Sequence, residues 1–106
     1  MRVLILTTFV ILLCLQVEVS SLKDVTNLDS RNIDQDDVET IIYAVKKLWK
    51  TNKDDFATKL QKYIKENVKN AEWEVIYMMA YGYTFVPKNY VRFNYEDYHF
   101  LIFFRP

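Results

Sequence analysis

The 106-residue chain has very little of what catalysis, metal binding or a disulfide framework requires: one cysteine, one histidine, one glycine and two prolines. Cys14 lies in an N-terminal apolar run, so no disulfide is expected in the remainder. One histidine without cysteine cannot form an ordinary zinc site. His99 lies in an expected strand and has no candidate partner for nucleophilic catalysis. We therefore expect no metal, no cofactor and no enzymatic activity.

An excess of charge of one sign is also missing, because 14 Lys and Arg balance 14 Asp and Glu. Nucleic-acid binding needs surplus basic side chains that displace counterions from phosphates, so no nucleic-acid partner is expected. A local surplus lies between residues 44 and 70, where eight lysines are opposed by three acids. It indicates either a solvated helix face or a contact with an anionic surface.

What the chain does have is apolar: 51% of its residues are hydrophobic and 16% are aromatic, which excludes a disordered chain. Its length corresponds to one domain at most. The acids Asp34, Asp36 and Asp37 are interpreted as the first turn of a helix, where carboxylates suit the helix dipole. A calcium loop of the EF-hand type would need a glycine and a distal glutamate that are absent there.

Residues 1–21 are interpreted as a signal peptide or N-terminal hydrophobic segment, separate from an expected single domain at 22–106. Arg2 precedes an uncharged apolar run, Val3 to Leu15, which is too short to span a bilayer but suits the core of a signal peptide. Cleavage near Val19 to Ser21 would give a secreted or endomembrane protein. Two other interpretations of this segment are an interfacial anchor that is retained and an inaccurate start of the chain. If it is retained, the segment would be the only membrane contact.

The spacing of apolar residues predicts two helices. A stripe from Val38 to Trp49 predicts a helix over Asp34–Trp49, with Ser30 as a candidate N-cap and residues 22–25 as a short edge strand. Thr51 to Asp54 resembles a capping box. It precedes a second stripe made of Phe56, Leu60, Tyr63, Ile64 and Val68.

The period changes to two from Trp73, which predicts strands up to the end of the chain. The first ends at Gly82, a short strand follows over Tyr83–Val86, and the last two are Val91–Tyr95 and Tyr98–Phe104, joined by a tight turn at Glu96-Asp97. We expect an α+β fold in which two amphipathic helices pack on an antiparallel sheet of four to five strands.

This ordered set of residues resembles the small cytoplasmic dynein light chain family, types 1 and 2, over residues 22–105. The resemblance is carried by Asp36-Asp37-Val38-Glu39, Phe56-Ala57 with the lysine-rich second helix, Trp73, Tyr81-Gly82, Val91-Arg92-Phe93-Asn94-Tyr95 and Leu101-Ile102-Phe103-Phe104-Arg105. The family is a non-catalytic, dimeric binding hub of the dynein motor complex, acting in microtubule-based processes. Its homodimer forms by exchange of the strand after the glycine.

The resemblance implies a groove between the exchanged strand and the second helix, where peptides such as that of a dynein intermediate chain add as a β-strand. The implied groove residues are Lys53, Asp54, Tyr81, Thr84, Phe85, Val86, Val91, Phe93 and Tyr95. The implied dimer-interface residues are Gln61, Lys62, Glu74, Tyr83 and Thr84. A secreted or surface protein that kept the fold but lost the dynein partnership is the alternative.

Several residues depart from the family's pattern near that groove. Pro87 stands where the family has a polar groove residue, and proline removes one ladder donor, worth ~0.5–1.5 kcal/mol. Glu74 replaces the histidine that makes the family's dimer acid-sensitive. Val91 and Phe93 stand in place of a Phe and a Tyr, and Lys53-Asp54 keeps an acidic-basic pair in swapped order.

Overall fold

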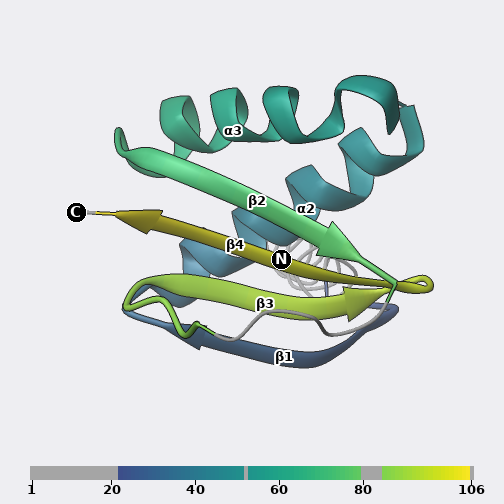
Figure 1. Ribbon diagram of the computed structural model, residues 1–106, viewed down its shortest axis with the longest axis horizontal. Helices are drawn as coiled ribbons and strands as arrows, with labels where there is room; N and C mark the ends of the chain where they lie inside the picture. Colours follow the sequence, from purple (N-terminus) through teal and green to yellow (C-terminus); the bar gives the residue numbers. More distant parts are fainter. Residues whose placement is uncertain (1–21, 52, 80–84, 106) are drawn as a thin grey trace, which may run out of the picture.

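A four-stranded antiparallel sheet covered on one face by two helices forms the body of the computed structural model, which describes residues 22–51, 53–79 and 85–105 (Figure 1). The strands are β1 (Val25–Arg31), β2 (Glu72–Met78), β3 (Tyr90–Tyr95) and β4 (Tyr98–Arg105). Their order in the sheet is β1-β3-β4-β2, so β1 and β2 are the edges. The α+β fold class predicted from the sequence is confirmed.

Helix α2 spans Gln35–Thr51 and carries its acids in the first turn, as the helix dipole favours. The predicted apolar stripe is its buried side, which includes Val38, Ile41, Val45 and Trp49. The prediction of Ser30 as N-cap was wrong, because Ser30 lies in β1. In the first turn of the helix, the backbone N–H of Val38 donates to Asp34 O at 2.9 Å.

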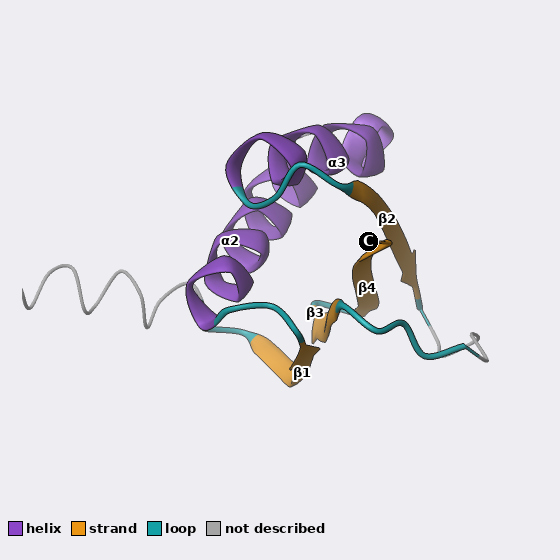
Figure 2. Cartoon of the chain, turned by 90° about the vertical axis from the view of Figure 1, so that its left-hand side faces the viewer, coloured by secondary structure: helices purple, strands orange, loops and turns teal. Residues whose placement is uncertain are grey.

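Helix α3 spans Phe56–Asn67 and follows a 3₁₀ turn, η1, at Lys53–Asp55. The predicted capping box at Thr51 does not form, since α2 continues through Thr51, whose Oγ1 donates to Lys47 O at 2.9 Å. The periodicity itself was correct, because Phe56, Leu60 and Ile64 are all buried against the core. Figure 2 shows both helices on the same side of the sheet.

The short edge strand predicted at residues 22–25 was misplaced, because residues 22–24 form a turn and the strand begins at Val25. Strand β1 extends to Arg31 and pairs with β3, with a bulge between Thr26 and Asp29 where Asn27 adopts a φ of 53°. The Asp29 carboxylate pairs with Arg92 at 2.9 Å. Strand β1 lacks an alternation of apolar residues, so its pairing and polar contacts with β3 keep it in the sheet.

The strands β2 and β3 follow the predicted alternation, whereas β4 is buried on both faces from His99 to Phe104. The turn at Glu96-Asp97 joins β3 to β4. Their helix-facing side chains form the core, listed by strand as Trp73, Val91, Phe93, Tyr95, Phe100, Ile102 and Phe104. A smaller cluster of Tyr90, Leu101 and Phe103, with Ile76 against it, lies on the other face. The expected strand at Tyr83–Val86 falls partly outside the described residues, and Phe85 and Val86 are not in a strand.

Candidate functional site

The outer edge of β2 is the candidate binding edge. Gln61 of α3 donates from its Nε2 to Trp73 O at 2.9 Å, so the carbonyl of Trp73 points away from β4. Because the N–H and C=O of one residue in a strand point to the same side and alternate along it, Val75 and Tyr77 also direct their peptide groups outward. Glu74 and Ile76 direct theirs to β4, opposite Phe103 and Leu101.

Helix α3 lies beside this edge and runs along β2 in both ribbon views (Figures 1 and 2). Gln61 is half-buried between the two elements, whereas Lys62 and Glu74 are exposed on α3 and β2. The other two predicted interface residues, Tyr83 and Thr84, lie outside the described residues. The edge of β2 thus combines outward peptide groups with a polar helix, which suits the addition of an extended segment.

The predicted groove residues lie in three different places. Lys53 and Asp54 are exposed in η1, and Phe85 and Val86 are 44% and 67% exposed in the segment before β3. Tyr81 and Thr84 lie outside the described residues. The remaining three side chains are buried between sheet and helices: Val91, Phe93 and Tyr95. Their contact with a peptide stays a prediction, and it requires the helix layer to separate from β3.

An aromatic cluster fixes the end of α2 where Lys53 begins the connection to α3. The indole of Trp49 makes edge contacts at centroid distances of 4.8–5.4 Å with Phe56, Tyr77, Tyr98 and Phe100. Its Nε1 donates to Glu96 Oε2 at 3.0 Å, and the Lys53 ammonium lies 5.3 Å from the centroid of the indole ring. The sequence indicated that Trp49 is buried, but the bond to Glu96 joins residues 47 positions apart and has no local signal.

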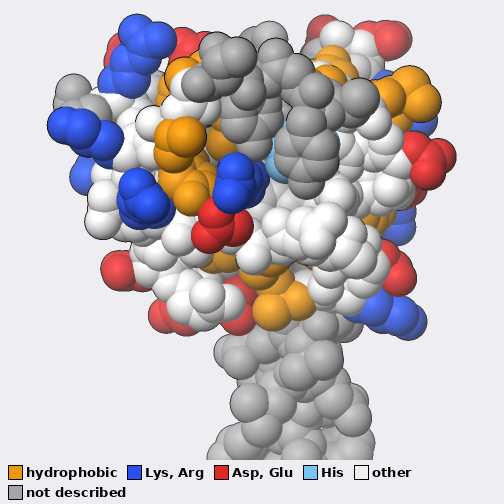
Figure 3. Space-filling model, turned by 60° about the horizontal axis from the view of Figure 1, so that its bottom comes forward, with side chains coloured by type: hydrophobic (Ala, Val, Ile, Leu, Met, Phe, Trp, Pro, Cys, Tyr) orange, Lys and Arg blue, Asp and Glu red, His pale blue; other side chains and the backbone are white. Residues whose placement is uncertain are grey.

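Two polar clusters lie on the sheet face opposite the helices, and Figure 3 shows basic, acidic and histidine side chains next to hydrophobic ones there. Asp29 Oδ2 accepts from Tyr90 Oη at 2.8 Å and from Arg92, and the hydrogen bond from Tyr90 is the main cause that lowers the pKa of Asp29. The same bond raises the pKa of Tyr90. His99 is 4% exposed and donates from Nδ1 to Asn94 Oδ1 at 2.8 Å; burial, with a smaller effect of Arg92, lowers its pKa. Neither cluster was predicted from the sequence.

A polar cavity of about 250 Å³ lies at the opposite end of the molecule from Lys53, between the β1–α2 connection and the end of α3. Its lining includes Asp34, Asp37 and Lys69, with the rings of Trp73 and Phe104. Trp73 Nε1 donates to Lys69 O at 2.8 Å. Among the described residues, no three His, Cys, Asp or Glu side chains gather as metal ligands do.

Comparisons with known proteins identify the fold. No family model matches the chain, and no curated protein sequence matches it. The chain is similar in structure to the dynein light chain-like domain of the calcium-binding protein FhCaBP2 from Fasciola hepatica, with a TM-score of 0.68 and 14% identity. The match covers 79% of this chain and 94% of that domain. The fold of this protein is therefore dynein light chain-like.

Proposed function

We propose that this protein is a non-catalytic, dimeric binding hub that docks partner peptides by β-strand addition. The observation that carries the proposal is the outer edge of β2, where Val75 and Tyr77 present peptide groups beside α3. An edge of this kind takes a further strand, whose backbone bonds give affinity and whose alternate side chains give specificity. The first added strand comes from a second copy, and a partner peptide then adds beyond it.

The connection between β2 and β3 supports the exchange. These strands are consecutive in the chain but are not neighbours, because β4 lies between them. The described parts of the connection carry exposed apolar side chains: Met79 is 73% exposed, Val86 67% and Phe85 44%, with the Phe85 ring 5.4 Å from that of Phe103. Phe85 and Val86 are adjacent, and contiguous exposed apolar side chains mark an interaction surface. Exchange of this connection between two copies would cover them.

Sedimentation velocity combined with amide hydrogen exchange tests the dimer. In an exchanged dimer, the amides of Val75 and Tyr77 are protected by the partner's strand, and protection falls as the chain is diluted. The amides of Glu74 and Ile76 are the internal control, since they face β4 in either state. A monomer at micromolar concentration whose Val75 and Tyr77 amides exchange freely contradicts the proposal.

We further propose that the protein is a subunit of a dynein motor complex, and the alternative is a secreted or surface protein that kept the fold but lost this partnership. The apolar run Val3 to Leu15 favours the alternative, because a secreted chain does not meet a cytosolic motor. Fusing residues 1–25 to a fluorescent reporter decides between the two. Cytosolic fluorescence with an intact Met1 supports the motor partnership, whereas secretion with a new N-terminus near residues 20–22 supports a fold retained for other partners.

A further inference from the structure

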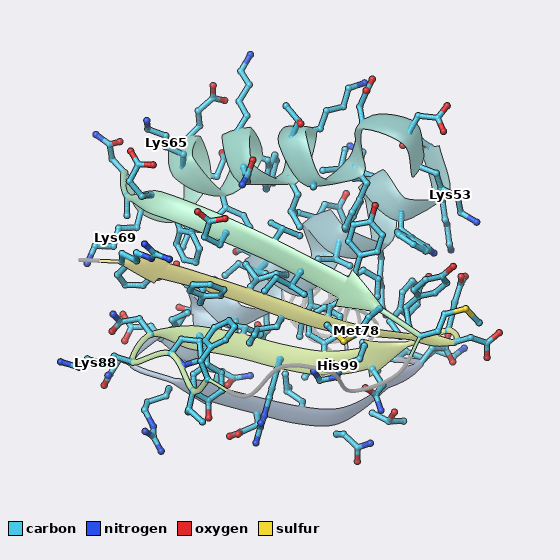
Figure 4. The ribbon with its side chains drawn as sticks, in the orientation of Figure 1. Lys53, Lys65, Lys69, Met78, Lys88 and His99 are labelled. Carbon is cyan, nitrogen blue, oxygen red and sulfur yellow. The ribbon has the colours of Figure 1, made fainter. Side chains whose placement is uncertain are left out.

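The outer side of the helix layer carries an array of exposed lysines. On α3, Lys62 and Lys65 are exposed, and Lys62 follows the fully buried Leu60 by two residues, which places it on the opposite side of the helix. Glu66 is the one acidic residue in the sequence of α3. Figure 4 shows Lys65 extending from α3 away from the sheet.

Helix α2 continues the array in its C-terminal half. Lys47 and Lys50 are exposed, and Tyr43, one turn before Lys47 on the same side of the helix, is 50% exposed. The acids of α2 lie at its other end, with Asp36 and Asp37 in the first turn. We call Lys47, Lys50, Lys62 and Lys65 the basic face. Since both helices lie on one side of the sheet (Figure 2), the basic face is a two-helix surface.

The chain enters the folded domain next to this face. Residues 22–24 form a turn in which Val25 N donates to Leu22 O at 3.3 Å, and the Nζ of Lys46 donates to Lys23 O. Lys46 lies on α2 directly before Lys47. In the sequence, the apolar run that ends at Leu15 is separated from Leu22 by only six residues. The described residues that follow the apolar run in the sequence therefore contact α2 directly beside the lysine surface.

We propose that the basic face docks on an anionic lipid bilayer. Lysines on two neighbouring helices match a broad negative surface, and each basic residue near such a surface contributes about 1 kcal/mol, or about fivefold in binding. An exposed tyrosine among them suits the headgroup region. In the uncleaved chain, the single apolar segment gives marginal membrane binding, and a basic patch is the second signal that makes the binding stable. This inference does not depend on the proposed peptide binding.

Co-sedimentation of the full chain with vesicles tests the docking. Vesicles of phosphatidylcholine alone report what the apolar segment contributes, and vesicles with about one third phosphatidylserine add what the lysines contribute. The double variant Lys50→Gln/Lys65→Gln removes one charge from each helix. We expect it to bind the anionic vesicles ~10–30-fold more weakly and the neutral vesicles equally, and the difference to shrink at ~0.5 M salt.

The matched control is Lys88→Gln/Arg105→Gln, which changes the net charge equally at exposed positions in the loop before β3 and at the end of β4. We expect less than about a twofold effect, because these charges lie outside the basic face. Circular dichroism confirms that each variant is folded. Equal binding to both vesicle types, an equal loss in the control, or preferential capture by soluble heparin or polyglutamate overturns the proposal.

Discussion

Replacing Trp49 with Phe is expected to lower the free energy of unfolding by ~2–3 kcal/mol. The indole is 4% exposed, makes edge contacts with four aromatic rings, and donates to Glu96 at 3.0 Å. The smaller ring leaves a void worth ~1–2 kcal/mol. Loss of the hydrogen bond adds ~1 kcal/mol, less than a fully buried bond to a charged acceptor, because Glu96 lies in an exposed turn.

Urea denaturation followed by far-ultraviolet circular dichroism, at one fixed protein concentration, measures these changes. Glu96→Ala is expected to cost ~1 kcal/mol, and its double variant with Trp49→Phe should show a coupling of ~1 kcal/mol, since both changes remove the same bond. Glu96→Gln is the matched control, because the amide keeps an acceptor oxygen, and should cost under ~0.5 kcal/mol. A coupling below ~0.3 kcal/mol would refute the importance given to this bond.

Three further predictions concern pH and the binding edge. The pKa of His99 is lowered from 6.5 in the folded chain, so the unfolded chain binds a proton more readily and the free energy of unfolding falls as pH drops below about 6.5. The variant His99→Gln should abolish that part of the loss, as measured by urea titrations at pH 7 and ~5. Because Glu74 stands where the resembled family has a titrating histidine, the proposed dimer should persist from neutral pH to about 5.5 in sedimentation experiments, and a split near pH ~6 would contradict this. A standard dynein light chain target peptide should bind this chain ~5–150-fold more weakly than it binds members of that family, as measured by isothermal titration. The variant Pro87→His should recover part of the affinity, whereas tight binding to the native chain would show that Pro87 does not weaken binding.

The parts of the fold that were predicted correctly are those governed by local periodicity. The buried sides of α2 and α3, and the alternation from Trp73 to Met78, follow from residues a few positions apart. Strand β1 was misplaced because its support is distant: Asp29 bonds to Tyr90 and Arg92, more than sixty residues later. The capping box failed for a local reason, since Thr51 bonds backward to Lys47 within α2.

The candidate site was predictable only as far as the family resemblance extended. Gln61 was named as an interface residue from that resemblance, and its bond to Trp73 O places it at the β2 edge. The outward direction of the Trp73 carbonyl, which this bond marks, could not be read from the sequence, because strand order decides which edge is open. Burial of Val91 and Phe93 under the helices likewise depends on the packing of layers, not on the alternation that both faces share.

The bulge in β1 limits how large an assembly this sheet can build. Growth of a sheet into a filament requires that every molecule offer two competent edges, one for the preceding copy and one for the next. At Asn27 the backbone turns to a positive φ and the pairing register shifts, so the outer side of β1 lacks the regular spacing that another strand needs. Among the described strands, β2 is then the edge with a regular ladder. In the proposed dimer, strand exchange between copies would therefore end in a closed pair and would not propagate into fibres.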